Sequence, residues 1–102
     1  DNFQIIKKNI TKIKSSRKYI KDYLDNIDIK NRSQYGNYIL LRFKSANEAT
    51  KVVKFLRKKL IYVKGPYPKP WDNYINISIG PIKVMKPFLK EIKQAKKKRL
   101  FN

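Results

Sequence analysis

The sequence predicts a single domain of the α+β class, with a small, mainly antiparallel sheet of three strands covered by helices. Two observations carry this prediction: apolar residues recur at helical three-four spacing in three segments, and they alternate or run together in short β-rich segments. The elements are expected in the order α-β-α-β-β-α. With 102 residues, 41% of them apolar, residues 1–102 can form one small core.

A first helix is predicted from about Asn2 to Leu24. Arg17 is the one residue that breaks its apolar stripe, and it is expected at the edge of the packing with its stem buried and its head in water. We expect the stripe to lie on the sheet, since three heptads are few for a coiled coil. The stripe residues are Phe3, Ile6, Ile10, Ile13, Ile20 and Leu24.

A polar connection and a strand are predicted next. The segment from Asp25 to Gln34 is rich in Asn and Asp, which favour turns because their side chains bond their own backbone. The segment from Tyr38 to Phe43, YILLRF, is nearly continuously apolar apart from Arg42. It is typical of a strand covered on at least one face, and a central position is compatible with it.

The second helix has a clear start signal. Ser45 stands three residues before Glu48, the capping-box spacing that satisfies free amides at a helix N-terminus. The helix is expected to run through ANEATKVVKFLRKKL. Its predicted buried face consists of Ala46, Ala49, Val52, Val53, Leu56 and Leu60.

Two strands and a proline-rich loop are predicted after this helix. Ile61 to Lys64 reads as a short strand, and Tyr74 to Ile79 alternates with period two. The loop between them, KGPYPKPWDN, is too rich in Pro and Gly for the core, yet it carries aromatic residues. The alternation predicts a buried isoleucine face and a polar face formed by Tyr74, Asn76 and Ser78.

A last helix follows Gly80-Pro81. It begins either near Lys83, with Pro87 in its first turns, or at Pro87 itself, because a proline in mid-helix costs about 3 kcal/mol. Its apolar residues are Ile82, Met85, Phe88, Leu89, Ile92 and Ala95, and its lysine-rich end suits the helix dipole.

Composition excludes most independent catalysis. The absence of Cys and His removes disulfides, thiolate chemistry, imidazole catalysis and zinc sites built on those residues. The three glycines are scattered and form no phosphate loop, so we expect no catalytic, cofactor-binding or metal-binding residues. No apolar run approaches the ~18 residues of a bilayer span, and DNFQIIKKNI lacks a signal-peptide core, which predicts a cytoplasmic location without a membrane partner.

The charge is strongly positive. There are 26 Lys and Arg residues, 21 of them Lys, against 7 Asp and Glu, which gives a formal net charge of +19. Such an excess attracts any polyanion, so non-specific attraction to nucleic acid is expected. A lysine-rich, solvated surface without a specific partner is the alternative.

The succession of RKYIKDYL, YGNYILLRF, a helix, LRKKLIYVKG, and YINISIG before a helix near VMKPFLKEI resembles a known domain. It is similar to the C-terminal small domain of class I/II pyridoxal-phosphate aminotransferases, most of all the histidinol-phosphate aminotransferases. The resemblance extends from about Ile10 to Lys93. It implies a domain that contributes to a substrate-binding pocket and is inactive alone.

The resemblance implies two substrate-binding positions. The family's arginine at the end of the first strand falls on Lys64, and the arginine that opens the second motif falls on Asn76. A lysine keeps the charge but not the bidentate fork, and an asparagine keeps hydrogen bonds alone. Recognition of an ordinary amino-acid carboxylate is therefore expected to be altered.

The same resemblance implies a missing part. In the family, pyridoxal phosphate is bound by a large domain N-terminal to this segment, and no lysine of this chain is nominated as its partner. A chain that starts at Asp1 suits a C-terminal fragment of a two-domain enzyme. The implied partners are that large domain, an amino-acid or phosphorylated amino-acid substrate, and a second subunit in a homodimer.

The competing hypothesis is a basic RNA-binding module with an α+β fold. Its aromatic residues would stack on single-stranded bases among the cations. The predicted element order differs from the βαββαβ order of the commonest such module. A domain that only mediates association is a third possibility. The aromatic residues concerned are Tyr35, Tyr38, Tyr62, Tyr67, Trp71 and Tyr74.

Overall fold

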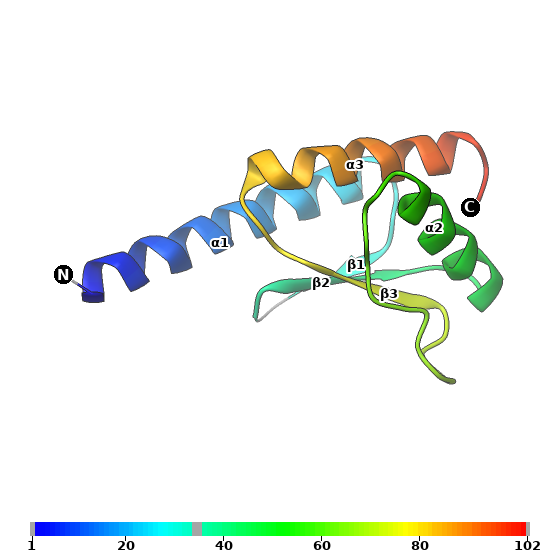
Figure 1. Ribbon diagram of the computed structural model, residues 1–102, viewed down its shortest axis with the longest axis horizontal. Helices are drawn as coiled ribbons and strands as arrows, with labels where there is room; N and C mark the ends of the chain where they lie inside the picture. The colour runs from blue at the N-terminus through cyan, green and yellow to red at the C-terminus, as the bar shows by residue number, and fades with distance from the viewer. Residues whose placement is uncertain (1, 34–35, 102) are drawn as a thin grey trace.

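The computed structural model describes the backbone of residues 2–33 and 36–101, and the side chains of residues 13–33 and 36–101. Figure 1 shows α1 and α3 side by side over the sheet, with α2 at one end. Within the described residues, no helix combines the length and apolar content that a bilayer crossing requires. The elements are α1 Asn2–Asn26, β1 Asn31–Arg32, β2 Tyr38–Arg42, α2 Ala46–Lys58, β3 Tyr74–Ser78 and α3 Ile82–Lys97.

The three strands form an antiparallel sheet in the order β1-β2-β3, which confirms the predicted α+β class and antiparallel three-stranded sheet. Strand β2 is central, and its Leu41 lies opposite Ile75 of β3. The two-residue strand β1 falls in the segment that was predicted as a turn.

The predicted strand from Ile61 to Lys64 is reduced to one antiparallel bridge, between Lys64 and Asn76 on the outer side of β3. With this bridge counted, the predicted element order is retained, and β1 is an addition to it. The segment lies between two turns, at Leu60 with φ 62° and at Gly65 with φ 125°. These turns leave too little extended chain for a longer ladder.

The core lies between one face of the sheet and the helices. Alternation places Ile39 and Leu41 of β2, and Ile75 and Ile77 of β3, on this face, as predicted for β3. Helix side chains meet them from the other side. The largest fully buried side chains are Ile20, Leu24, Ile39, Leu41, Leu56, Ile75, Leu89, Ile92 and Val52.

Helix α1 confirms the predicted helix and ends two residues later. Ile20 and Leu24 are fully buried, and Ile13 packs partly against the core. The side chains of the earlier stripe residues, Phe3, Ile6 and Ile10, lie outside the described residues. On the solvent side, Lys18 Nζ donates to Asp22 Oδ2 at 2.8 Å, and this hydrogen bond, followed by the Coulomb attraction, raises the pKa of Lys18.

Arg17 is half-buried at the edge of α1, as the interrupted stripe predicts. Its guanidinium Nη2 donates a hydrogen bond to the backbone carbonyl of Gly36. The contact joins the middle of α1 to the start of the turn that leads into β2. Arg17 therefore holds Gly36 close to α1, and the stem of its side chain covers apolar surface.

Helix α2 begins as its capping signal predicts. Ser45 Oγ accepts a hydrogen bond from the backbone N–H of Glu48 at 3.2 Å, and Glu48 Oε1 accepts one from the backbone N–H of Lys44 at 3.1 Å. Ala49, Val52, Val53 and Leu56 are buried, as predicted. Ala46 is half-buried.

The predicted burial of Leu60 is wrong. The helix ends at Lys58, and Leu60 takes a left-handed conformation with φ 62°. This turns its side chain out of the helical stripe, so 77% of the residue is exposed. The periodicity of a sequence cannot reveal that a helix stops two residues short of the last apolar position.

Helix α3 begins at Ile82, so the first of the two predicted starts is the one adopted. Pro87 lies inside the helix on its exposed side, where it cannot donate to the carbonyl of Lys83. The opposite side of the helix is apolar and packs on the core. Its buried residues are Met85, Phe88, Leu89, Ile92 and Ala95.

The three helices end in the same way. Each has a residue with positive φ two positions after its last helical residue, namely Asp28, Leu60 and Arg99. The following amide bonds back into the last turn: Ile29 N–H to the Leu24 carbonyl at 2.9 Å, Ile61 to Leu56 at 2.9 Å and Leu100 to Ala95 at 3.1 Å. This is the Schellman arrangement, which usually has glycine at the left-handed position.

Candidate functional site

The side of the sheet opposite the core is open. Along β2 the residues facing this side are Tyr38, Leu40 and Arg42, and along β3 they are Tyr74, Asn76 and Ser78. None of these six residues is buried. This open face combines aromatic, apolar and polar side chains, which distinguishes it from a simply solvated sheet surface.

The loop between Lys64 and β3 lies on the side of the sheet away from the helices (Figure 1), and part of it lines a hollow together with residues of this open face. Two backbone hydrogen bonds shape its end, Trp71 N–H to the Pro68 carbonyl at 3.0 Å and Tyr74 N–H to the Trp71 carbonyl at 3.2 Å. The rings of Trp71 and Tyr74 meet edge to face, with centroids 5.8 Å apart. The loop is thereby held against the strand that follows it.

Loop and sheet together enclose a hollow of about 540 Å³, which we call the aromatic groove. Trp71 is 60% exposed and Tyr38 41% exposed, so aromatic surface is accessible to a ligand. The lining contains two cations and no carboxylate. It consists of Arg32, Tyr38, Leu40, Tyr67, Pro68, Lys69, Trp71, Tyr74 and Asn76.

Lys64 and Asn76, the two positions singled out in the sequence, lie directly opposite each other. The Lys64 N–H donates to the Asn76 carbonyl at 3.0 Å, and the Asn76 N–H donates to the Lys64 carbonyl at 2.8 Å. Residues opposed in this way direct their side chains to the same face of a sheet. The structure therefore brings both side chains to the open face. Asn76 lines the aromatic groove, and Lys64 is exposed and lines a neighbouring hollow beside α3.

The predicted aromatic set divides between two places. Tyr38, Tyr67, Trp71 and Tyr74 line the aromatic groove, whereas Tyr62 lies in a separate hollow of about 320 Å³ beside α3. Tyr35 lies outside the described residues. Tyr62 is 72% exposed and thus offers an aromatic surface of the same kind away from the groove.

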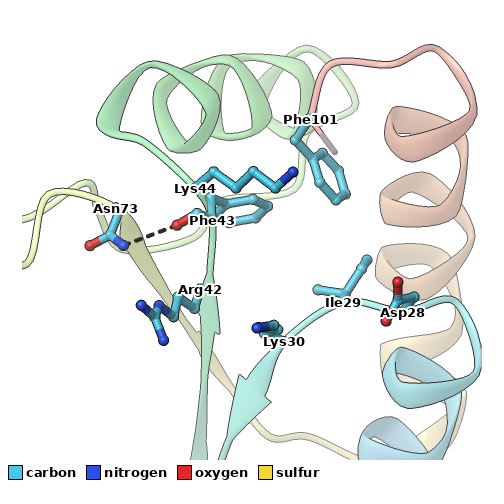
Figure 2. Close-up of a pocket in the computed structure, with 8 residues that line it drawn as sticks. All are labelled: Asp28, Ile29, Lys30, Arg42, Phe43, Lys44, Asn73 and Phe101. Carbon is cyan, nitrogen blue, oxygen red and sulfur yellow. Dashed lines mark hydrogen bonds between the residues drawn. The ribbon is translucent and has the colours of Figure 1, made fainter.

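A second hollow, of about 390 Å³, lies at the end of β2 and is called the end pocket (Figure 2). Phe43 and Phe101 meet edge to face in it, with centroids 5.0 Å apart, and Asn73 Nδ2 donates to the Phe43 carbonyl at 2.9 Å. Lys30, Arg42 and Lys44 contribute three cations. The lining is completed by Asp28 and Ile29.

The end pocket was not predicted from the sequence. Phe101 reaches it because the turn at Arg99 folds the C-terminal residues back from α3, whereas the lysine-rich end was interpreted only as a helix terminus. Lys96 contributes to this arrangement, since its Nζ donates to the carbonyls of Ile27 and, at 2.9 Å, of Asp28. Arg42 is the one charged residue in an apolar strand, and it was the only sequence feature that pointed to this pocket.

A metal site finds no support in the described residues, because they contain no group of three Asp or Glu side chains that could hold an ion. The aromatic groove contains no Asp or Glu at all. The described lining residues offer ring faces, one amide group and positive charge to a ligand.

No family profile and no curated protein matches this sequence. Solved structures do match its fold. A protein from Erwinia carotovora atroseptica, provisionally described as a histidinol-phosphate aminotransferase, superimposes with a TM-score of 0.77 at 16% identity over 89% of this chain and 25% of its own. The histidinol-phosphate aminotransferase of Sinorhizobium meliloti, solved in complex with pyridoxal-5'-phosphate, gives a TM-score of 0.73 at 19% identity, over 95% and 26% of the two chains.

A protein from Burkholderia pseudomallei, provisionally described as an aminotransferase, has a TM-score of 0.76 at 25% identity over 92% of this chain and 28% of its own. The chain thus shares its fold with a segment of aminotransferases and spans about a quarter of their length. This agrees with the fold that the sequence resemblance implies.

Proposed function

We propose that this chain is the C-terminal small domain of a pyridoxal-phosphate-dependent aminotransferase of the histidinol-phosphate type, and that it is inactive alone. One observation carries the proposal: nearly the whole chain superimposes on such enzymes, yet it covers only 25–28% of their length. A separate large domain, and a second copy of the whole enzyme, would complete the active site.

In this proposal the open face of the sheet forms one wall of the substrate pocket. Lys64 provides a point charge, and Asn76 provides a carboxamide that can donate and accept hydrogen bonds. Their backbone bridge keeps the two side chains adjacent. They would bind an acidic group of an amino-acid or phosphorylated amino-acid substrate, without the bidentate geometry of an arginine.

The lining of the aromatic groove does not fit pyridoxal phosphate by itself. A site for this cofactor needs a lysine for the Schiff base and a partner for the pyridine nitrogen, usually an acidic residue. The aromatic groove has Lys69 but no carboxylate to accompany it. We therefore assign the cofactor to the large domain and derive no chemical step for this chain.

The proposal is tested by titrating pyridoxal phosphate into the longest natural polypeptide that contains this sequence, followed by absorbance. A Schiff-base band is expected in the long form, and none is expected in the 102-residue chain. If no band forms in either, or if no longer polypeptide exists, the aminotransferase proposal is wrong.

Asn76→Arg in the long form is expected to tighten binding of a carboxylate substrate by about tenfold, because a guanidinium can form two charge-assisted hydrogen bonds where the amide forms neutral ones. Substrate affinity measured by calorimetry checks this. Ser78→Arg is the matched control, since Ser78 lies two residues along β3 on the same open face and is exposed. Equal gains for both variants would indicate general charge attraction and exclude Asn76 from the pocket.

A further inference from the structure

Three neighbouring hollows, which we call the strip, run from the open face of the sheet to the end of β2. The aromatic groove shares Arg32, Leu40 and Tyr74 with a hollow of about 400 Å³ beside it, which we call the bridging hollow. The bridging hollow in turn shares Lys30 and Arg42 with the end pocket. The shared lining residues place the three hollows next to one another, so an extended ligand that leaves the aromatic groove would meet the cations of the other two.

Aromatic rings lie at one end of the strip. Trp71 and Tyr38 expose 60% and 41% of their surfaces, and Tyr74 lies between them and the bridging hollow. Exposed rings that line a groove are the feature on which unpaired bases stack, and every base offers such a face. Packing within the chain leaves much of the surface of Trp71 and Tyr38 in contact with solvent.

Cations follow the strip along its length. Lys69 and Arg32 line the aromatic groove, Arg32, Lys30 and Arg42 line the bridging hollow, and Lys30, Arg42 and Lys44 line the end pocket. Figure 2 shows Lys30 and Arg42 among the side chains of the end pocket, and both also line the bridging hollow. Asp25 and Asp28 are the two carboxylates among the lining residues of these three hollows, so the strip is positive throughout.

We propose that the open face of this chain binds single-stranded nucleic acid, with bases stacked on Trp71, Tyr74 and Tyr38 and with phosphates paired to Arg32, Arg42 and Lys69. Stacking requires unpaired bases, which excludes a duplex as the preferred ligand. The net charge of +19 adds a general attraction for the nucleic acid, and the strip would determine where on the surface it binds. This activity goes beyond the proposed function, and a large domain over the same face would compete with it.

The test uses the 102-residue chain and an oligouridine of about twelve nucleotides, a length that one small domain can cover. Trp71 is the single tryptophan, so its fluorescence reports on the groove directly. Saturable quenching of Trp71 is expected, with affinity that falls steeply between about 50 and 200 mM salt. An oligodeoxyuridine of the same length differs only in the sugar and shows whether the 2'-hydroxyl matters. A blunt DNA duplex and heparin provide polyanions without accessible bases.

Two pairs of variants separate stacking and placed charge from general attraction, with affinity measured by anisotropy of a labelled oligonucleotide. Trp71→Ala is expected to weaken binding on the order of tenfold. Tyr62 is an even more exposed aromatic residue outside the strip, and Tyr62→Ala is expected to change the affinity less than about twofold. Arg32→Gln with Arg42→Gln is compared with Lys51→Gln with Lys54→Gln on exposed positions of α2. Both double variants lose the same charge, and only the first is expected to weaken binding strongly.

Several results would overturn the proposal. The first is that the duplex or heparin binds as tightly as oligouridine. The second is that oligouridine binds but leaves the fluorescence of Trp71 unchanged, and the third is that the two double variants lose the same amount of affinity. Each of these results would mean that binding is only the general attraction of a basic surface for polyanions. Because all six substituted positions are exposed, circular dichroism is expected to show an unchanged fold in every variant. The absorbance test of the aminotransferase proposal uses the long form, so either proposal can fail alone.

Discussion

Leu56→Ala is expected to lower the free energy of unfolding by about 3 kcal/mol, a large part of the stability of a small domain. Leu56 is fully buried on α2, where it belongs to the core between the helices and the sheet. The truncation removes apolar contacts and leaves a cavity that rigid neighbours cannot fill completely. Urea unfolding followed by far-ultraviolet circular dichroism measures the loss.

Leu60→Ala is the matched control for this substitution. Leu60 stands four residues later on the same apolar stripe of the sequence, but it is 77% exposed. Its truncation is expected to change the free energy of unfolding by less than about 0.5 kcal/mol. Similar losses at the two positions would mean that α2 continues past Lys58 and that the turn at Leu60 is wrong.

Gly65→Ala is expected to cost about 2–3 kcal/mol and to displace the loop that forms the aromatic groove. Gly65 has φ 125°, a conformation that side chains of L-residues rarely adopt. A Cβ there would lie 2.8 Å from the backbone oxygen of Tyr74, so the backbone would have to move. Loss of slow amide exchange at Lys64 and Asn76 would report rupture of the bridge beside it.

Gly80→Ala provides the comparison for Gly65. The nearest atom to a Cβ at Gly80 is Met85 Sδ at 3.7 Å, which is ordinary van der Waals contact. This variant is expected to retain the bridge and to lose less than about 1 kcal/mol. If Gly80→Ala damages the bridge as much as Gly65→Ala does, the close approach at Gly65 is not what holds the loop.

The regular elements were predictable because their patterns are local. Period two in β3 and three-four spacing in α2 and α3 follow directly from burial on one face. The Ser45 cap was predictable for the same reason, since both partners lie within four residues. Strand β1 was not predicted because a two-residue strand has no periodicity. It forms by pairing with the free edge of β2, which its own sequence does not reveal.

The site was predictable only in part. The family resemblance led to Lys64 and Asn76, and the structure places them opposite each other. The contribution of Arg32 and of the end pocket was not predicted, because it depends on residues that are distant in sequence, such as Phe43 and Phe101. Aromatic composition indicated a binding surface, but it could not separate Tyr62 from the residues of the groove.

The ends of the three helices have a consequence for what determines this fold. A left-handed conformation costs an L-residue roughly 1–2 kcal/mol, and the chain accepts this cost at Asp28, Leu60 and Arg99 without using glycine. After each turn an apolar residue returns to the core: Ile29 is buried, and Ile61 and Leu100 pack partly against it. Packing of these apolar residues therefore determines the direction of the chain after each helix, although the local backbone preference opposes it. We expect these turns to form late in folding, when the core is in place.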